Sequence, residues 1–171
     1  VLSSLAQLAD LTLDSHLMQR VKTFFDRGLW DMRDEIGWSP ESTGPKNDPN
    51  PDRGEMNNTG DIVETALILG SWGYTEYFDD AERIIRGHML PSQLRDVSFI
   101  VEPENPDGLD GRRDVSRRLQ GAFGFPAPYG HEPPGVSAVG FNLDIVGGTV
   151  GSLCEAYRII TTHDESGHRV N

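Results

Sequence analysis

Three carboxylates stand close together where a polar stretch of the chain runs into an apolar one: Glu55, Asp61 and Glu64. Two such groups on either side of a bond can act as general acid and general base, which is the chemistry of glycoside hydrolysis. Carboxyl groups about 5 Å apart retain the configuration of the sugar, and a separation of about 6.5–9.5 Å inverts it. Sequence spacing does not give this distance, although Asp61 and Glu64 share one helix face at i and i+3. These three residues are the candidate catalytic groups, with Glu55 first among them.

A simpler interpretation explains the same residues without catalysis. The sequence after them is apolar almost all round a helical wheel, so a helix over 58–71 is expected to be buried on most sides. Asn58 or Thr59 is expected to be its N-cap, and Asp61 then lies near the positive end of the helix dipole. On this interpretation the acidic residues are the solvated start of a core helix, and both interpretations stay open.

Other polar and aromatic side chains are candidates for binding a sugar. Aromatic rings can stack on the apolar faces of sugars, and amides and carboxylates can bind hydroxyl groups. The candidates for substrate binding are Asn57, Asn58, Trp38, Tyr129, His131, Asn142 and Asp144. Core packing and Asx turns also explain these residue types. One histidine with scattered carboxylates is a weak metal pattern, so no metal ligand is expected.

Composition narrows the classes of partner. The chain has 171 residues, enough for one domain with a sizeable core. Its 27 acidic and 15 basic residues give a net charge of -12, which argues against binding nucleic acid or an anionic membrane by bulk electrostatics. It has no apolar run of about 18 residues, so no membrane-spanning helix is expected. Cys154 is the single cysteine, which excludes an internal disulfide and a multi-thiolate metal site. The cellular compartment is left undecided.

Hydrophobic spacing predicts an all-α fold built from helix pairs. Helices are expected over 3–13, 15–36, 58–71, 75–89, 114–120 and 145–162, with a short strand within 94–101. A turn of a few residues joins the third helix to the fourth, which predicts an antiparallel hairpin with an inner and an outer member. Asp114 is expected to cap the fifth helix. Glycines early in the last helix favour close packing there, and the final residues, 163–171, are expected to be a polar tail.

Long irregular segments bear on completeness. Prolines and glycines predict loops over 37–57, 102–113 and 121–140. Compact domains seldom contain such long loops unless these are functional or packed on something else. We therefore expect a homo-oligomer, or association with the remaining part of a longer parent chain. Sedimentation is the measurement that tests this expectation, and a stable compact monomer would contradict it.

Several motifs resemble a known family. They are the run Arg53–Asp61, the turn Trp72–Tyr74, the segments Tyr77–Arg83 and His88–Leu94, the pair Gly147-Gly148 and the segment Cys154–Tyr157. Together they resemble the six-hairpin (α/α)6 toroid proteins, and the β-L-arabinofuranosidase-like glycoside hydrolases with their uncharacterised relatives in particular. The resemblance covers roughly residues 3–162 and implies a partial toroid that corresponds to the later hairpins. It also implies a site at the ends of the inner helices.

The resemblance breaks down at the metal site. In those hydrolases a Glu-x-Cys segment and a later Cys-Cys pair bind zinc, and one cysteine is the nucleophile. Glu55 matches the glutamate, whereas Asn57 replaces the cysteine and the later segment 142–146 contains none. Cys154 lies well inside a predicted helix and is expected to be a core residue. The zinc and cysteine mechanism is therefore not expected, and no cofactor is implied.

Two classes of function remain. The first is a carbohydrate-active, glycoside hydrolase-like protein that uses the carboxylates at the inner-helix ends. The second is a non-catalytic helical domain that binds a glycan or another protein. The carboxylates gathered in one concave pocket with aromatic rings would favour the first, and the same groups dispersed or paired would favour the second.

Overall fold

The structure is a computed structural model of the 171-residue chain, and it describes residues 2–40, 56–123, 146–164 and 167–170. The helical elements are α1 (Leu2–Thr12), α2 (Ser15–Thr23), the π-helical turn η1 (Phe24–Gly28), α3 (Met56–Ser71), α4 (Glu76–Ile84), the π-helical turn η2 (Ile85–Met89), the 3-10 turn η3 (Asp110–Arg112), α5 (Val115–Leu119) and α6 (Val146–Ile159). Strands β1 (Thr161–Asp164) and β2 (Gly167–Val170) pair antiparallel at the end of the described chain. The described part is mostly helical, which confirms the all-α class, although this small hairpin replaces the expected polar tail.

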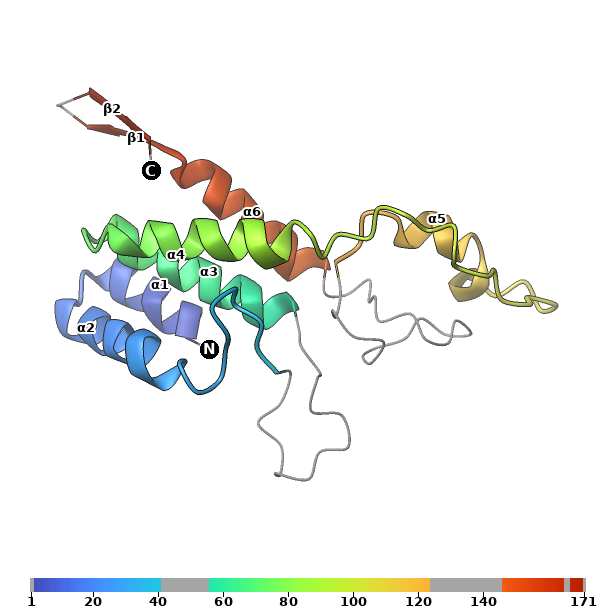
Figure 1. The fold of residues 1–171 in the computed structure, drawn as a ribbon, viewed down its shortest axis with the longest axis horizontal. Helices are drawn as coiled ribbons and strands as arrows, with labels where there is room; N and C mark the ends of the chain where they lie inside the picture. Colours follow the sequence, from blue (N-terminus) through green and yellow to red (C-terminus); the bar gives the residue numbers. More distant parts are fainter. Residues whose placement is uncertain (1, 41–55, 124–145, 165–166, 171) are drawn as a thin grey trace.

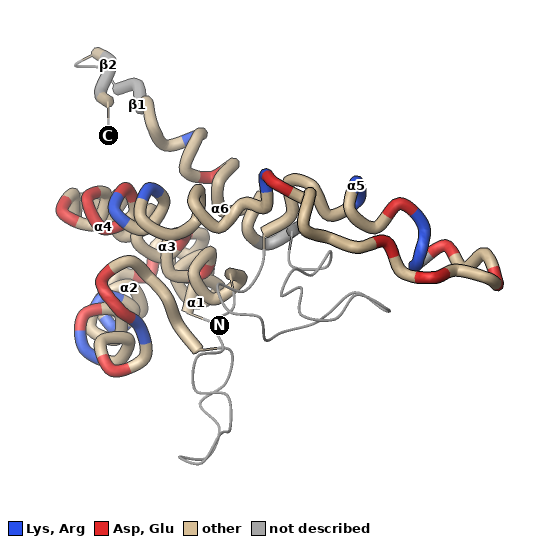
Figure 2. The backbone as a smooth tube through the Cα atoms, turned by 45° about the vertical axis from the view of Figure 1, so that its right-hand side comes forward, with Lys and Arg blue, Asp and Glu red and all other residues tan. Residues whose placement is uncertain are grey.

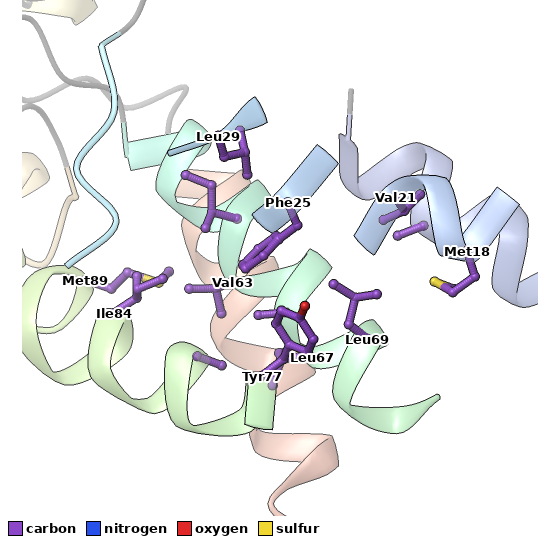
Figure 3. Packing of buried hydrophobic residues seen from close by; sticks show 14 of the residues in the cluster. Met18, Val21, Phe25, Leu29, Val63, Leu67, Leu69, Tyr77, Ile84 and Met89 are labelled. Carbon is purple, nitrogen blue, oxygen red and sulfur yellow. The ribbon is translucent and has the colours of Figure 1, made fainter. Parts of the chain in front are cut away.

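Helix α3 is the centre of the molecule. It packs against α1, α4 and α6, and α2 packs against α1 (Figure 1). Its sequence is apolar on nearly every side, and Val63, Ala66 and Leu69 have no exposed surface. Figure 3 shows side chains from η1, α3, α4 and η2 meeting in one cluster around Val63 and Tyr77. The hydrophobic pattern thus explains why the other helices gather around α3.

The turn between α3 and α4 is built as the sequence predicts. Gly73 has a φ of +98°, a conformation that glycine adopts without strain. The Tyr74 N–H donates to the Leu69 carbonyl at 3.2 Å, and the Gly73 N–H donates to the Gly70 carbonyl at 3.0 Å. This double hydrogen bond is a Schellman motif, which ends α3 and reverses the chain. Trp72 fixes the turn to α1, because its Nε1–H donates to Asp10 Oδ1 at 2.6 Å.

The predicted helix over 15–36 is wrong in its second half. Asp14 caps its start, accepting from the Leu17 N–H at 2.9 Å. Regular helix nevertheless stops at Thr23, and the π-helical turn η1 ends at Gly28. Beyond it the Asp34 side chain accepts hydrogen bonds from the N–H groups of Ile36 and Trp38, at 3.0 and 2.9 Å. An Asx turn of this kind competes with helix, which is why the apolar spacing was misleading there.

The segment over 94–122 corrects two more predictions. Residues 94–101 form no strand; instead the Leu94 N–H and carbonyl bond to Ala122 and Gly121 at 2.8 and 2.7 Å. Asp114 does not cap α5, since it has a φ of +48° and its side chain makes no capping hydrogen bond. Glu102 takes that place, accepting from the N–H groups of Val115 and Ser116 at 2.8 and 2.9 Å. A carboxylate distant in sequence thus stabilises the start of the helix.

Two small residues of α6, Cys154 and Gly151, do not have the roles expected from the sequence. Cys154 is exposed rather than part of the core. A Cβ added at Gly151 would meet no atom within 4 Å, so this glycine does not permit close packing. The residues of α6 that do pack on the main cluster are Leu153, Ala156 and Ile159. None of the described helices combines the length and the apolar character that crossing a bilayer requires.

The outer helices and the central helix differ in their content of charged residues. Figure 2 shows residues of both signs along α4, whereas α2 carries the basic residues Arg20 and Lys22. Helix α3 contains two charged residues, Asp61 in its second turn and Glu64 near its middle. Two of the candidate carboxylates, Asp61 and Glu64, are therefore the charged groups of the core helix.

Candidate functional site

A groove lies beside the first half of α3, where α1, α2 and the segment after η1 come together. Its volume is about 760 Å³, within the usual range for small-molecule sites. The residues that line it are Leu2, Leu5, Leu17, Arg20, Val21, Phe24, Leu29, Met32, Ser39, Pro40, Asn58, Asp61, Ile62 and Thr65. Most of these are apolar, and the charged groups among them are Arg20 and Asp61. We call this surface the α1–α2–α3 groove.

Asn58 and Asp61 reach the groove because they lie nearly one turn apart on α3. The sequence expected Asn58 or Thr59 to cap the helix, but the described helix already begins at Met56. Instead, Asn58 Nδ2 donates to the Pro40 carbonyl at 2.9 Å, and Thr59 Oγ1 donates to the Gly37 carbonyl at 2.8 Å. Both side chains thus hold the preceding segment against α3, which is a correction to the predicted capping.

The structure separates the two candidate carboxylates of α3. Asp61 lines the groove, and its backbone carbonyl accepts from the buried Thr65 hydroxyl at 2.7 Å. Glu64 lies outside the groove and its Oε1 accepts from Gln7 Nε2 of α1 at 2.7 Å. The shared helix face predicted from the i, i+3 spacing therefore does not bring the two carboxylates to one surface.

Of the other candidate residues named from the sequence, some lie within the described residues and the rest lie outside them. Asn57 is half-buried in the first turn of α3 and does not line the groove. Trp38 is also half-buried, next to the lining residues Ser39 and Pro40, and its backbone bonds to Asp34. The remaining candidates lie outside the described residues: Glu55, Tyr129, His131, Asn142 and Asp144.

Sequence reasoning missed Phe24 and Arg20 as groove residues. Phe24 and Phe25 both fit the apolar spacing of the predicted helix over 15–36, yet Phe24 is 49% exposed, whereas Phe25 is buried. Neighbouring helical residues point about 100° apart, so the two rings cannot both lie at the centre of one buried face. The spacing of Arg20 and Phe24, i and i+4, was the signal that both lie on the same face. Gly28 leaves room for the ring, because a Cβ there would lie 3.0 Å from it.

The described part of the groove carries two charges of opposite sign. Arg20 and Asp61 bring one positive and one negative charge to an otherwise apolar surface. In the described ranges, three or more His, Cys, Asp or Glu side chains nowhere gather into a group that could hold a metal ion. Such a surface suits a neutral ligand that has both apolar faces and hydrogen-bonding groups.

Comparison with known proteins adds no relative. No family model matches the chain, and neither the curated proteins nor the solved structures contain a significant match.

Proposed function

We propose that the protein is carbohydrate-active and that it binds a sugar in the α1–α2–α3 groove. The observation that supports this is the mixed character of the groove surface. Sugars present apolar C–H faces together with hydroxyl groups, and Phe24 offers an exposed ring for the former. Asn58, Asp61 and Arg20 offer hydrogen-bonding groups for the latter.

The arrangement of the helices supports a partial (α/α)6 toroid. Helices α1, α3 and α6 form a row in which α3 contacts both of the others, while α2 packs on α1 and α4 packs on α3. Alternating inner and outer helices are what such a toroid requires. The groove lies beside the first half of α3, which agrees with a site at the end of an inner helix. The resemblance of the sequence motifs points to the same fold.

We further propose that any hydrolysis uses Asp61 together with Glu55. The general acid and base route needs two carboxylates at the scissile bond. Asp61 lines the groove, whereas Glu64 is hydrogen-bonded to Gln7 and lies outside it. Glu55 directly precedes Met56, the first described residue of α3, and is the remaining candidate in the sequence.

A non-catalytic role is the alternative. It is favoured by one observation: within the described residues that line the groove, Asp61 is the sole carboxylate. On this alternative the groove binds a glycan, or a segment of another protein, without cleaving it.

Binding is tested by titrating mono- and oligosaccharides, furanosides included, while following the backbone NMR signals. Asp61→Asn keeps the shape of the side chain and removes its charge. A hydrogen bond to a charged group is worth about 1.5–3 kcal/mol, so we expect affinity to fall about 10- to 100-fold. Glu64→Gln is the matched control, because it makes the same change on the same helix outside the groove. Equal affinity of the two variants, or no binding by the wild type, would overturn the proposed site.

Hydrolysis is tested by screening aryl-glycosides against the wild type, Glu55→Gln and Asp61→Asn. Turnover that disappears in both variants and persists in Glu64→Gln would establish the two carboxylates as acid and base. Sugar binding without turnover would establish the non-catalytic alternative.

A further inference from the structure

Residues 36–40 form one side of the α1–α2–α3 groove, and we call them the groove wall. Ser39 and Pro40 line the groove directly. Hydrogen bonds from Thr59 to the Gly37 carbonyl, at 2.8 Å, and from Asn58 to the Pro40 carbonyl, at 2.9 Å, hold the wall against α3. The position of the wall therefore sets the width of the groove.

The other side of the groove wall rests on the junction of α4 and η2. A Cβ added at Gly37 would lie 2.7 Å from the Ile84 side chain, so the backbone is in direct contact with it. In the same way, the Ile36 side chain would lie 3.0 Å from a Cβ added at Gly87. Gly37 is buried and has a φ of +79°, a conformation that suits glycine. Packing of this density leaves the wall little room to adjust to a change beneath it.

His88 is buried at this junction. Its side chain belongs to η2 and is 7% exposed, and its Nδ1 makes no hydrogen bond within the described part of the chain. Burial lowers the pKa of His88 below its ordinary value, although the Asp34 carboxylate and the Ile36 backbone favour the charged ring. We call the wall position seen in this structure the closed state. The closed state favours a neutral His88 ring, because a charged ring would place an unpaired donor in a buried position.

The charged groups around His88 offset little of the free-energy cost of protonating its buried ring. Asp34, from the turn before the wall, is the charged residue that acts on the ring, and its Oδ1 already accepts two backbone hydrogen bonds. Arg83, from α4, donates to the Glu35 carbonyl at 3.0 Å. Arg86, from η2 itself, pairs with Glu82 at 2.7 Å. A proton gained by His88 is thus opposed mainly by burial.

We propose that His88 is a proton-sensitive support of the groove wall, so that protonation loosens residues 36–40 and opens the groove as the pH falls below neutral. That this opening controls access of a ligand rests on the proposed function. The loosening of the wall is a property of the chain alone.

The direction of the pH dependence follows from the pKa of His88 in the open and closed states of the wall. In the open state His88 has the ordinary histidine pKa of about 6.5, and in the closed state its pKa is lower. The open state therefore binds more protons as the pH falls through 6.5, so the stability of the closed wall is full above this pH and lost below it. Opening at pH 5.5 should exceed opening at pH 7.5 by up to about tenfold.

Hydrogen exchange followed by mass spectrometry measures this opening without any ligand. After correction for the intrinsic pH dependence of exchange, we expect peptides over 34–40 and the first turns of α3 to lose protection by up to about tenfold between pH 7.5 and 5.5. His88→Gln cannot gain a proton in this range and should abolish the change. His16→Gln removes an exposed histidine of α2 and should leave the change as it is in the wild type.

A second measurement does not depend on any variant folding. In the wild type, NMR titration of the His88 ring and of the wall amides should give one common midpoint, below 6.5. Wall protection that does not change with pH, an equal change in His88→Gln, or two different midpoints would each overturn the proposal. Failure to bind sugar would leave these results unaffected, and a pH-independent wall in a sugar-binding protein would refute this inference alone.

Discussion

Tyr77 shows how a single side chain joins two elements. Its ring packs edge-on against Phe25 of η1, with 5.3 Å between the ring centroids, and its hydroxyl donates to the Asp26 carboxylate. Lys22 of α2 lies 5.3 Å from the centre of the same ring and bonds to Asp26 at 2.8 Å. One aromatic residue of α4 therefore anchors both the apolar and the charged side of α2 and η1.

The titration of Tyr77 is the prediction that follows at this scale. Burial, and next the hydrogen bond to Asp26, raise the pKa of Tyr77 to about 12. The pKa of Lys22 is raised as well, chiefly by its hydrogen bond to Asp26. Because both folded-state values exceed the unfolded ones, their stabilisation is full below pH about 10 and is lost as the pH rises toward 12. Ultraviolet titration of the wild type minus Tyr77→Phe should show a midpoint near 12.

The control for this titration is Tyr157→Phe, which removes an exposed phenol of α6. A Tyr77 midpoint at the ordinary value of about 10 would contradict the buried, hydrogen-bonded ring.

At the residue scale, two of the residues proposed from the sequence, Asn58 and Asp61, line the groove. Asn58 and Asp61 could be selected because both precede the apolar run of α3. The spacing of Phe24 with Arg20 indicates that they share a helix face, but only the packing of the helices shows that this face lines the groove. Glu64 has the same chemistry as Asp61, and only the position of Gln7 on α1 shows that it lies outside the groove.

At the scale of elements, success depended on how many signals agreed. For α3 and α4 the apolar pattern and the amphipathic face agree, and the structure has a helix at each place, although α3 begins two residues earlier, at Met56, and α4 ends at Ile84 before the π-helical turn η2. Past Gly28 the apolar spacing stood alone, and the Asx turn at Asp34 overrode it. The cap of α5 could not be found, because Glu102 comes from a separate segment.

Replacing two helix glycines by alanine should change the stability of the fold in opposite directions. A Cβ at Gly70 of α3 would lie 2.6 Å from the Phe78 ring of α4, so Gly70→Ala should push the two helices apart and destabilise the fold by about 1–3 kcal/mol. A Cβ at Gly151 of α6 would meet nothing within 4 Å, so Gly151→Ala should stabilise by up to about 1 kcal/mol through helix propensity. Urea unfolding measures both, and changes of the same sign would contradict this account of the packing.

At the scale of the whole molecule, the described chain contains two hydrophobic clusters. The larger one surrounds α3 and draws on every element that packs against it. The smaller one consists of Leu94, Ile100, Val115 and Leu119, with Val97 at its edge. Figure 1 shows the segment that carries α5 extending away from the helical layer. The all-α class was predictable from periodicity, whereas this division was not, because it depends on contacts between residues distant in the sequence.

The two clusters should open separately. Leu69 and Leu119 are both buried, at 0% and 1% exposure, and differ in the cluster they belong to. Leu69→Ala should cost about 2–5 kcal/mol of global stability, because its cavity lies in the main core. Leu119→Ala should speed hydrogen exchange over 94–119 and leave the exchange of α3 unchanged, since the small cluster can open without exposing the larger one.

Urea unfolding followed by circular dichroism, combined with hydrogen exchange, distinguishes these outcomes. For Leu119→Ala the main transition should stay within about 0.5 kcal/mol of the wild type, as for a change remote from the core. The small cluster has few apolar members, so its opening free energy should be well below the global value that α3 reports. If Leu119→Ala instead lowered the protection of α3 as much as Leu69→Ala does, the two clusters would unfold as a single cooperative unit. They would then be separate in space but not in their free energies of opening.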